Sequence, residues 1–148
     1  MNRIIQPIPG TCLCGRVQFT ITPPTDFCAH CHCESCRLAH GSPVVTWTSV
    51  PLGQFKLISG QTSLKWYASS EWVEWGFCVE CGSSMFYRAV KEGHPEKPRT
   101  NVMYVAVGNL TGALDKSPSD RYSCEEEVTW FHGIETLPRY CGKTNKRL

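Results

Sequence analysis

The chain has 148 residues and a mass of 16.6 kDa, with 41% hydrophobic and 19% charged residues, a balance typical of a globular protein rather than a disordered one. A chain of this length buries roughly two-thirds of its unfolded surface, so it needs no crosslinks merely to fold. The formal net charge of +2 gives no support for a nucleic-acid or membrane-surface partner. Ten cysteines are the unusual feature of the composition.

Short stretches of alternating apolar and polar residues follow one another along the chain, separated by frequent prolines and glycines, which favours β-strands over long helices. In chain order, strands are predicted at residues 16–22, 44–50, 54–58, 64–68, 71–77, 84–87, 102–107 and 128–131. Helical turns are predicted at residues 34–38 and near residues 114–115, and a polar surface loop at residues 91–100. The pattern predicts a single mostly β domain over residues 1–148, built as a sandwich or as folded-over antiparallel sheets.

The cysteines admit two environments, an oxidising one that forms disulfides and a reducing one in which thiolates bind metal. Residues 1–10 contain two prolines and no apolar run of the length that a secretory signal needs. No other apolar run approaches the ~18 to 20 residues that cross a bilayer. We therefore expect a cytoplasmic protein with reduced thiols and no membrane partner, while a disulfide framework stays an alternative because the cysteine count is even.

Four cysteines form two doublets, each followed by glycine: Cys12 with Cys14, and Cys78 with Cys81. Closely spaced cysteines converge on one ion from a tight turn, and the glycine permits the backbone conformation that such a turn needs. Disulfides at such spacings are strained and close little loop. The spacing predicts a structural zinc held by these four thiolates, although Cys28 and Cys31 form a further doublet that competes for the partner at Cys78 and Cys81.

A second group places three thiolates within six residues, which cover only one side of an ion and leave a position open. These residues are Cys31, Cys33 and Cys36. Zinc sites with three protein ligands and an exchangeable position are typical of catalysis, so these residues are the predicted catalytic site, acting through the zinc. An iron–sulfur cluster and a redox-active dithiol remain alternatives, as does a closed structural site. The fourth ligand that would close the site is Cys28 or one of His30, His32 and His40.

Several segments of the sequence match one known family in order. They are residues 10–19 (GTCLCGRVQF), 31–37 (CHCESCR), 77–83 (FCVECGS), 107–110 (VGNL) and 137–140 (LPRY). With these segments the chain resembles the glutathione-dependent formaldehyde-activating enzyme family, of which centromere protein V is a divergent relative. The resemblance covers residues 10–140, which we expect to be the core of the domain.

The resemblance implies a structural zinc at the four-cysteine group and a second, catalytic zinc at the three-cysteine group, two zincs per chain. It also implies two coiled antiparallel sheets like those of the B-type methionine sulfoxide reductases. Two positions depart from the family pattern. Cys28 precedes the second group, where it closes the site or forms a disulfide, and Tyr122 stands where relatives often have histidine.

The activity that the resemblance implies is that of a carbon–sulfur lyase, working on a glutathione adduct of formaldehyde or of a related small carbonyl compound. The open zinc position takes the glutathione sulfur, lowers the pKa of the thiol and presents the thiolate to a small aldehyde. The product is S-hydroxymethylglutathione. Glutathione is then the co-substrate, and Arg37 is a candidate to bind one of its carboxylates.

Two other classes of function compete with the enzyme. In one, both zincs are structural and the chain is a binding module, which the basic residues of the tail at 142–148 support. In the other, Cys28 and Cys31 make a thiol–disulfide or sulfoxide reductase. The remaining chemistry-bearing residues are expected to be packing tryptophans, surface or packing histidines and free thiols. They are Trp47, Trp66, Trp72, Trp75 and Trp130, then His94 and His132, then Cys124 and Cys141.

Overall fold

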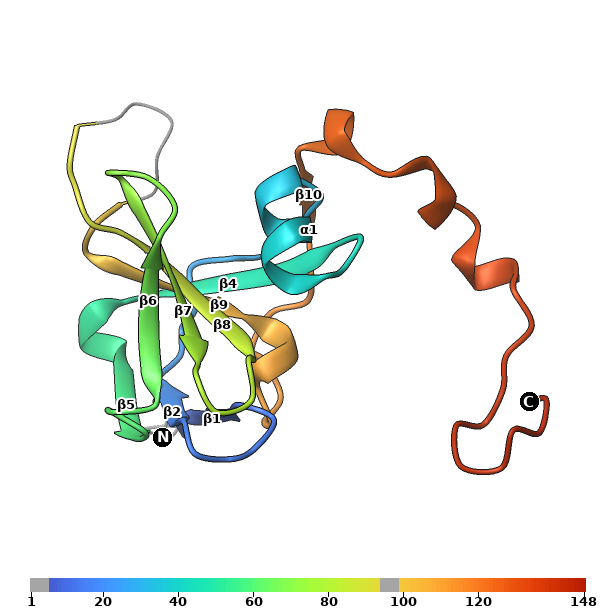
Figure 1. Ribbon diagram of the computed structural model, residues 1–148, viewed down its shortest axis with the longest axis horizontal. Helices are drawn as coiled ribbons and strands as arrows, with labels where there is room; N and C mark the ends of the chain where they lie inside the picture. Colours follow the sequence, from blue (N-terminus) through green and yellow to red (C-terminus); the bar gives the residue numbers. More distant parts are fainter. Residues whose placement is uncertain (1–5, 94–98) are drawn as a thin grey trace, which may run out of the picture.

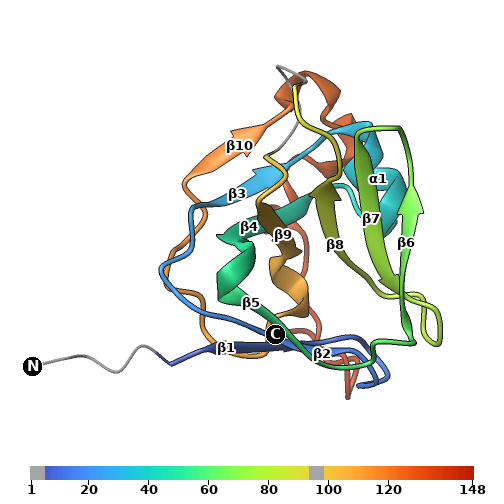
Figure 2. The same cartoon turned by 90° about the vertical axis from the view of Figure 1, so that its left-hand side faces the viewer.

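A computed structural model describes residues 6–93 and 99–148 of the chain. A small antiparallel sheet has the strand order β1-β2-β5 and lies beneath a larger sheet in Figure 2. Its strands are β1 (Ile8–Thr11), β2 (Gln18–Ile21) and β5 (Phe55–Ser59). Because β2 alternates, its apolar side chains Phe19 and Ile21 point into the protein while Gln18 faces solvent.

The larger sheet has seven strands in the order β10-β3-β4-β9-β8-β7-β6. Neighbouring strands run antiparallel except for β10 and β3, which run parallel. The strands are β3 (Cys28–Cys31), β4 (Val45–Pro51), β6 (Leu64–Ala68), β7 (Val73–Cys78), β8 (Ser84–Ala89), β9 (Val102–Ala106) and β10 (Asp120–Tyr122).

The main hydrophobic core lies where the small sheet meets strands β4, β8 and β9 of the large one. Phe19, Phe55 and Phe86 form its aromatic centre, with the rings of Phe19 and Phe86 edge to face at 4.8 Å. Gly10 is required beneath this cluster, because a Cβ there would lie 2.1 Å from Cζ of Phe19. The closely packed centre fixes the two sheets against each other and so fixes the loops that carry cysteines.

The only α-helix in the described residues, α1 (Glu34–His40), follows β3 directly. Cys33 caps its first turn, since the Cys33 sulfur accepts a hydrogen bond from the Cys36 amide, and Gly41 ends it in the left-handed conformation with φ of 58°. Short 3-10 turns occupy η1 (Leu52–Gln54), η2 (Val107–Asn109), η3 (Cys124–Glu126), η4 (Thr129–Phe131) and η5 (Ile134–Thr136). No helix among the described residues has the length and apolarity to cross a membrane.

The prediction of a mostly β protein with two sheets is confirmed, and seven of the predicted strands correspond to β2 and β4 through β9 within two residues at most ends. The strand predicted at residues 128–131 is wrong, because that segment forms the 3-10 turn η4. The helical turn near residues 114–115 is also wrong; Asp115 instead accepts two hydrogen bonds from Thr25. Part of the predicted loop at 91–100, including His94, lies outside the described residues.

The expectation that both sheets are antiparallel is wrong at one edge. After β9 the chain takes residues 107–119 to return to the far side of β3, and a connection of that length allows the parallel pairing of β10. Beyond β10, residues 123–148 leave the sheets as an extended segment, coloured orange to red in Figure 1. We call residues 123–148 the C-terminal arm.

Candidate metal centres and the adjoining cavity

The first cysteine group joins two hairpin loops that are far apart in the sequence. Cys12 and Cys14 lie in the loop between β1 and β2, while Cys78 ends β7 and Cys81 lies in the turn that follows it. Each loop is a tight knuckle: the Gly15 amide donates to the Cys12 carbonyl at 3.1 Å and the Gly82 amide to the Cys78 carbonyl at 2.8 Å. Both glycines have positive φ, 78° and 75°, which explains why glycine follows each doublet.

The four sulfurs fit a tetrahedral metal ion. They all lie within 4.8 Å of one another, with 3.5 Å between those of Cys12 and Cys14 and 3.8 Å between those of Cys14 and Cys78. Sulfurs bound about 2.3 Å from a tetrahedral zinc lie about 3.8 Å apart, whereas disulfide sulfurs lie about 2.05 Å apart. Accordingly all ten cysteines, each in the described ranges, are free of disulfides. The Ser83 side chain, hydrogen-bonded to Cys81, helps to lower the pKa of the Cys81 thiol to about 5, which favours the thiolate form that metals bind.

The second group lies where β3 ends and α1 begins. The sulfurs of Cys31, Cys33 and Cys36 are mutually within 4.8 Å, and the capping turn of the helix brings them together over six residues. Two donors point at this group: the Cys36 amide at 3.3 Å from the Cys33 sulfur, and Nε1 of Trp47 at 3.3 Å from the Cys36 sulfur. N–H donors aimed at sulfur stabilise thiolates, so the surroundings of this group also suit a cation.

The pKa values of the three thiols in the second group also favour a bound cation. Hydrogen bonds from Cys31 and Cys36 lower the pKa of Cys33 to about 2, while sharing those protons raises the pKa of Cys31 and of Cys36. Three thiolates this close therefore do not all ionise unaided, because each added negative charge repels the others. A divalent cation removes the repulsion, and the donor set of three thiolates fits zinc.

Neither Cys28 nor a neighbouring histidine joins the second group. Side chains alternate along β3, so Cys28 and His30 point to the opposite face of the sheet from Cys31. His30 hydrogen-bonds through Nδ1 to the Thr46 hydroxyl at 2.8 Å, and Cys28 is buried, which raises the pKa of its thiol. His40 donates from Nδ1 to the Cys36 carbonyl at 3.2 Å, and burial lowers its pKa. The group keeps three ligands and an open side.

That open side faces a cavity of about 790 Å³. The walls come from β3, β4, α1, the turn between β6 and β7, β7, β8, β9 and β10, and they are aromatic, aliphatic, hydroxyl or thiol in character. The lining residues are Phe27, Ala29, Cys31, Cys33, Ser35, Cys36, Trp47, Ser69, Ser70, Val73, Trp75, Tyr87, Tyr104 and Tyr122.

The prediction that the tryptophans serve packing is confirmed for Trp47, which is buried in a second hydrophobic cluster, but not for Trp130. Trp47 from β4 and Trp75 from β7 also line the cavity, Trp75 together with Val73 of the same strand, and Trp130 on the C-terminal arm is 72% exposed. Trp66 also packs, stacked on Phe86, with the Arg88 guanidinium 3.9 Å from its ring centre. The ammonium of Lys91 lies 4.4 Å from the ring centre of Trp72.

Two residues singled out in the sequence lie on different sides of the cysteines. Tyr122, which departs from the family pattern, is half exposed and lines the cavity. Arg37 does not; it lines a separate pocket of about 150 Å³ beside Trp130, and its Nε is buried without a hydrogen bond. A contact between Arg37 and glutathione therefore stays a prediction.

A family model described as glutathione-dependent formaldehyde-activating enzyme matches residues 7–130, which include both cysteine groups. The chain belongs to this family. It is also 28% identical over 86 residues to an uncharacterized lyase of Schizosaccharomyces pombe, a match that covers 58% of this chain and 61% of that relative. The chain thus spans about three-fifths of the relative's length. A crystal structure of a Rhodobacter sphaeroides protein shares the fold, with a TM-score of 0.57 at 21% identity over 77% of this chain and 99% of that one.

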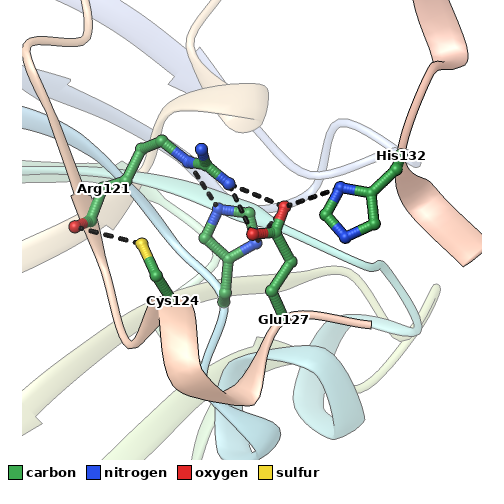
Figure 3. A network of polar contacts seen from close by, with 5 residues as sticks. Arg121, Cys124, Glu127 and His132 are labelled. Carbon is green, nitrogen blue, oxygen red and sulfur yellow. Dashed lines mark hydrogen bonds and ion pairs between the residues drawn. The ribbon is translucent and has the colours of Figure 1, made fainter. Parts of the chain in front are cut away.

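The match to the formaldehyde-activating enzyme family ends inside a polar network that sequence reasoning missed, shown in Figure 3. Arg121 on β10 donates to both carboxylate oxygens of Glu127 at 2.6 Å, and its Nε donates to Nε2 of His32 at 3.4 Å. Glu127 also lies 3.9 Å from His32 and 4.0 Å from His132. His32 stands between two ligands of the second group, so the network ties the C-terminal arm to that group. No spacing in the sequence signals it, because the partners lie up to 95 residues from Glu127.

Proposed function

We propose that this family member is a zinc-dependent carbon–sulfur lyase that makes or cleaves the adduct of a thiol, glutathione or a similar compound, with formaldehyde or a related carbonyl compound. The observation that carries the proposal is the three-sulfur group with its open side toward a cavity. A metal with three protein ligands keeps a position for an exchangeable ligand, and a soft thiol suits a zinc that is already bound by thiolates. The family match and the lyase-named relative support the reaction class.

Zinc held by Cys31, Cys33 and Cys36 lowers the pKa of a thiol that binds it, so that the nucleophilic thiolate prevails near neutral pH. The residues around it hold and orient the three sulfurs. The capping turn of α1 fixes Cys33 relative to Cys36, and the indole N–H of Trp47 fixes the Cys36 sulfur from the cavity side. The aromatic walls offer apolar surface beside the three sulfurs.

The overall step is an addition without change of oxidation state. In synthesis the sulfur–carbon bond forms, the carbonyl π bond breaks, and the proton lost from the thiol ends on the carbonyl oxygen. The lyase direction returns that proton to sulfur as the sulfur–carbon bond breaks. Proton transfer to oxygen is the step for which a side chain matters most, and Tyr122 and Ser70 are the lining residues that we propose for it.

The proposal extends to the rest of the molecule. The four-cysteine group holds a structural zinc, so that the chain binds two zincs, and the sheets resemble those of the B-type methionine sulfoxide reductases. We place the domain at residues 1–148 with its core at about 10–140. The proposed compartment is the cytoplasm, because ten unpaired cysteines persist most readily in a reducing environment.

Metal content combined with thiol titration tests the ligand assignment. We expect two zincs per chain and three thiols free of metal, at Cys28, Cys124 and Cys141, of which the buried Cys28 reacts slowly in the folded chain. One zinc together with a disulfide among Cys28, Cys31, Cys33 and Cys36 would refute the assignment. The function is tested separately by replacing the second zinc with cobalt: glutathione is expected to change its visible absorption, and no change at saturating thiol would contradict the proposal.

The reductase alternative loses its geometric support in the structure. Cys28 faces away from Cys31 on β3, and burial raises the pKa of the Cys28 thiol, whereas an attacking cysteine needs an accessible thiolate. A binding module without catalysis is the second candidate function, since the C-terminal arm exposes apolar side chains such as Trp130 and Leu137. Absence of any effect of thiols on the cobalt spectrum would favour that function.

A further inference from the structure

The cavity beside the second cysteine group is far larger than formaldehyde requires. Its volume of about 790 Å³ falls within the ~300–1,000 Å³ of pockets that enclose drug-sized ligands. Formaldehyde is little larger than water, which occupies ~30 Å³ in the liquid. A cavity of this size next to the open side of the sulfurs therefore has room for a substantial organic group attached to the reacting carbon.

The walls offer that group aromatic surface. The rings of Tyr87 and Tyr104 are stacked at 4.2 Å, Trp47 meets Tyr87 edge to face at 4.7 Å, and Trp75 lies 5.6 Å from Tyr87. Both indole N–H groups on these walls are engaged within the protein, that of Trp47 with Cys36 and that of Trp75 with Ser69 at 2.9 Å. Because Trp47 is only 3% exposed, it is Trp75 that presents ring surface, rather than a polar group, to a ligand.

The walls also lack charge. None of the described lining residues is acidic, basic or a histidine. Arg99, which hydrogen-bonds to Tyr104, is paired with Asp26 at 3.3 Å and is largely exposed. Three thiolates around a zinc leave one net negative charge at the end of the cavity, so a buried carboxylate would be both unpaired and repelled. The two carboxylates of glutathione therefore belong outside the cavity, and a neutral group belongs inside it.

We propose that the cavity binds the ring of an uncharged aromatic carbonyl compound, so that the substrate of this family member is the thiol adduct of an aromatic aldehyde. The reacting steps rest on the proposed function, but the binding of the ring does not. The thiol sulfur adds to the aldehyde carbon, the carbonyl π bond breaks, and the thiol proton moves to oxygen. The ring lies against Trp75, while the remainder of the thiol stays near the exposed Tyr122.

Isothermal titration calorimetry of the zinc-loaded chain with benzyl alcohol and with benzoate tests the inference. These probes share a ring, contain no thiol or aldehyde, and differ in charge. We expect benzyl alcohol to bind at least tenfold more tightly than benzoate, because the cavity has no cation to pair with the carboxylate. Equal binding of the two, or tighter binding of benzoate, would overturn the inference.

A substitution in the cavity wall tests whether the ring of the probe binds in this cavity. Trp75→Ala is expected to weaken benzyl alcohol binding about tenfold, through the loss of aromatic contact. Trp130→Ala is the matched control, since Trp130 is exposed and lies outside this cavity, and it should leave the affinity unchanged. A loss in Trp130→Ala without one in Trp75→Ala would overturn the placement. The comparison of the two probes on the unaltered chain stands even if Trp75→Ala does not fold.

A third measurement separates this inference from the proposed function. The cobalt-substituted chain is titrated with glutathione, and adduct formation is then followed with benzaldehyde and with formaldehyde by the loss of free thiol. Both the proposed function and the aromatic substrate are supported if glutathione changes the cobalt spectrum and adduct formation is at least tenfold greater with benzaldehyde than with formaldehyde. If benzyl alcohol binds but thiols leave cobalt unchanged, the ring site holds and the proposed function fails. If thiols change the spectrum but adduct formation is no greater with benzaldehyde than with formaldehyde, the function holds and the aromatic substrate is wrong.

Discussion

The two cysteine groups use the same donor atom but differ in the number of donors and in what surrounds them. The first draws one doublet from each of two hairpin loops, and its loops are further joined by the Leu13 amide, which donates to the Ser83 hydroxyl at 2.9 Å. The second is local to one strand end and one helix start, and it opens on an aromatic cavity. Ligands that arrive from both sides enclose an ion, whereas ligands from one side leave room for chemistry.

The difference predicts opposite consequences for stability. A metal in the first group joins segments more than sixty residues apart and contributes directly to the free energy of folding. A metal in the second group is bound within six residues, so it constrains little of the unfolded chain. The first group should therefore stabilise the fold and the second should carry the reaction.

The largest expected effect is that of Cys78→Ser. Cys78 is fully buried in the main core, and its loss leaves an incomplete cage of three thiolates. Structural zinc binding is worth about 10–16 kcal/mol in small zinc domains, comparable with the ~5–15 kcal/mol stability of a whole domain. We expect the variant to lose cooperative thermal unfolding, measured by circular dichroism.

The control for Cys78→Ser is Cys124→Ser, which removes an exposed thiol outside both groups and should unfold like the unaltered chain. Retention of two zincs and of normal unfolding in Cys78→Ser would show that the first group is not a structural metal site.

Cys33→Ser should have a large effect on metal content and a small one on folding. Serine is a good helix N-cap, so the start of α1 is preserved while one of three metal ligands is lost. We expect the zinc content to fall from two to one per chain, and the free energy of unfolding to change by less than about 2 kcal/mol. Mass spectrometry of the native chain and urea denaturation measure the two quantities. Loss of both metals from this variant would contradict the independence of the groups.

Trp47→Phe tests how the cavity wall supports the second group. The substitution keeps an aromatic ring but removes the N–H that lies 3.3 Å from the Cys36 sulfur. Groups that hydrogen-bond to metal ligands typically contribute about 10–100-fold to metal affinity, so we expect cobalt to bind the second group roughly tenfold more weakly. Trp75→Phe is the matched control, because its N–H donates to Ser69 instead. Equal weakening in both variants would mean that packing, rather than the hydrogen bond, matters.

Local patterns predicted much of this arrangement. Doublet spacing and the following glycines assigned Cys12, Cys14, Cys78 and Cys81 to one group, because a metal knuckle is built from neighbouring residues. The alternation of apolar and polar residues likewise located β2 and β4 through β9, because it is also a pattern of neighbouring residues. It missed β1, which contains Pro9 and Gly10, β3, where cysteines and a histidine hide the apolar pattern, and the short, exposed β10.

The cavity could not be predicted from the sequence, because its walls come from eight separate segments. Trp47 and Trp75 lie in strand-like runs that are equally typical of core packing, and only the order of strands in the large sheet brings them to the same side as Cys36. The orientation of Cys28 depends on the phase of β3, which the sequence does not reveal. Site residues that are neighbours in the sequence could be predicted, whereas site residues that only the order of the strands brings together could not.

The smallest expected effect concerns the arm that adjoins only the second group. Glu127 accepts from Arg121 and lies near His32, whose neighbours in the chain are Cys31 and Cys33. Glu127→Gln removes the charge that holds this contact, and because Arg121 is about half exposed we expect a loss of stability of about 1 kcal/mol or less. Hydrogen exchange should nevertheless become faster at the His32 amide, which donates to the Tyr122 carbonyl at 3.0 Å, while amides around Cys12 and Cys78 stay unchanged. Glu125→Gln, a change of the same kind at an exposed arm residue, is the control. Equal acceleration by both substitutions, or acceleration around the first group, would show that the arm does not act specifically on the second group.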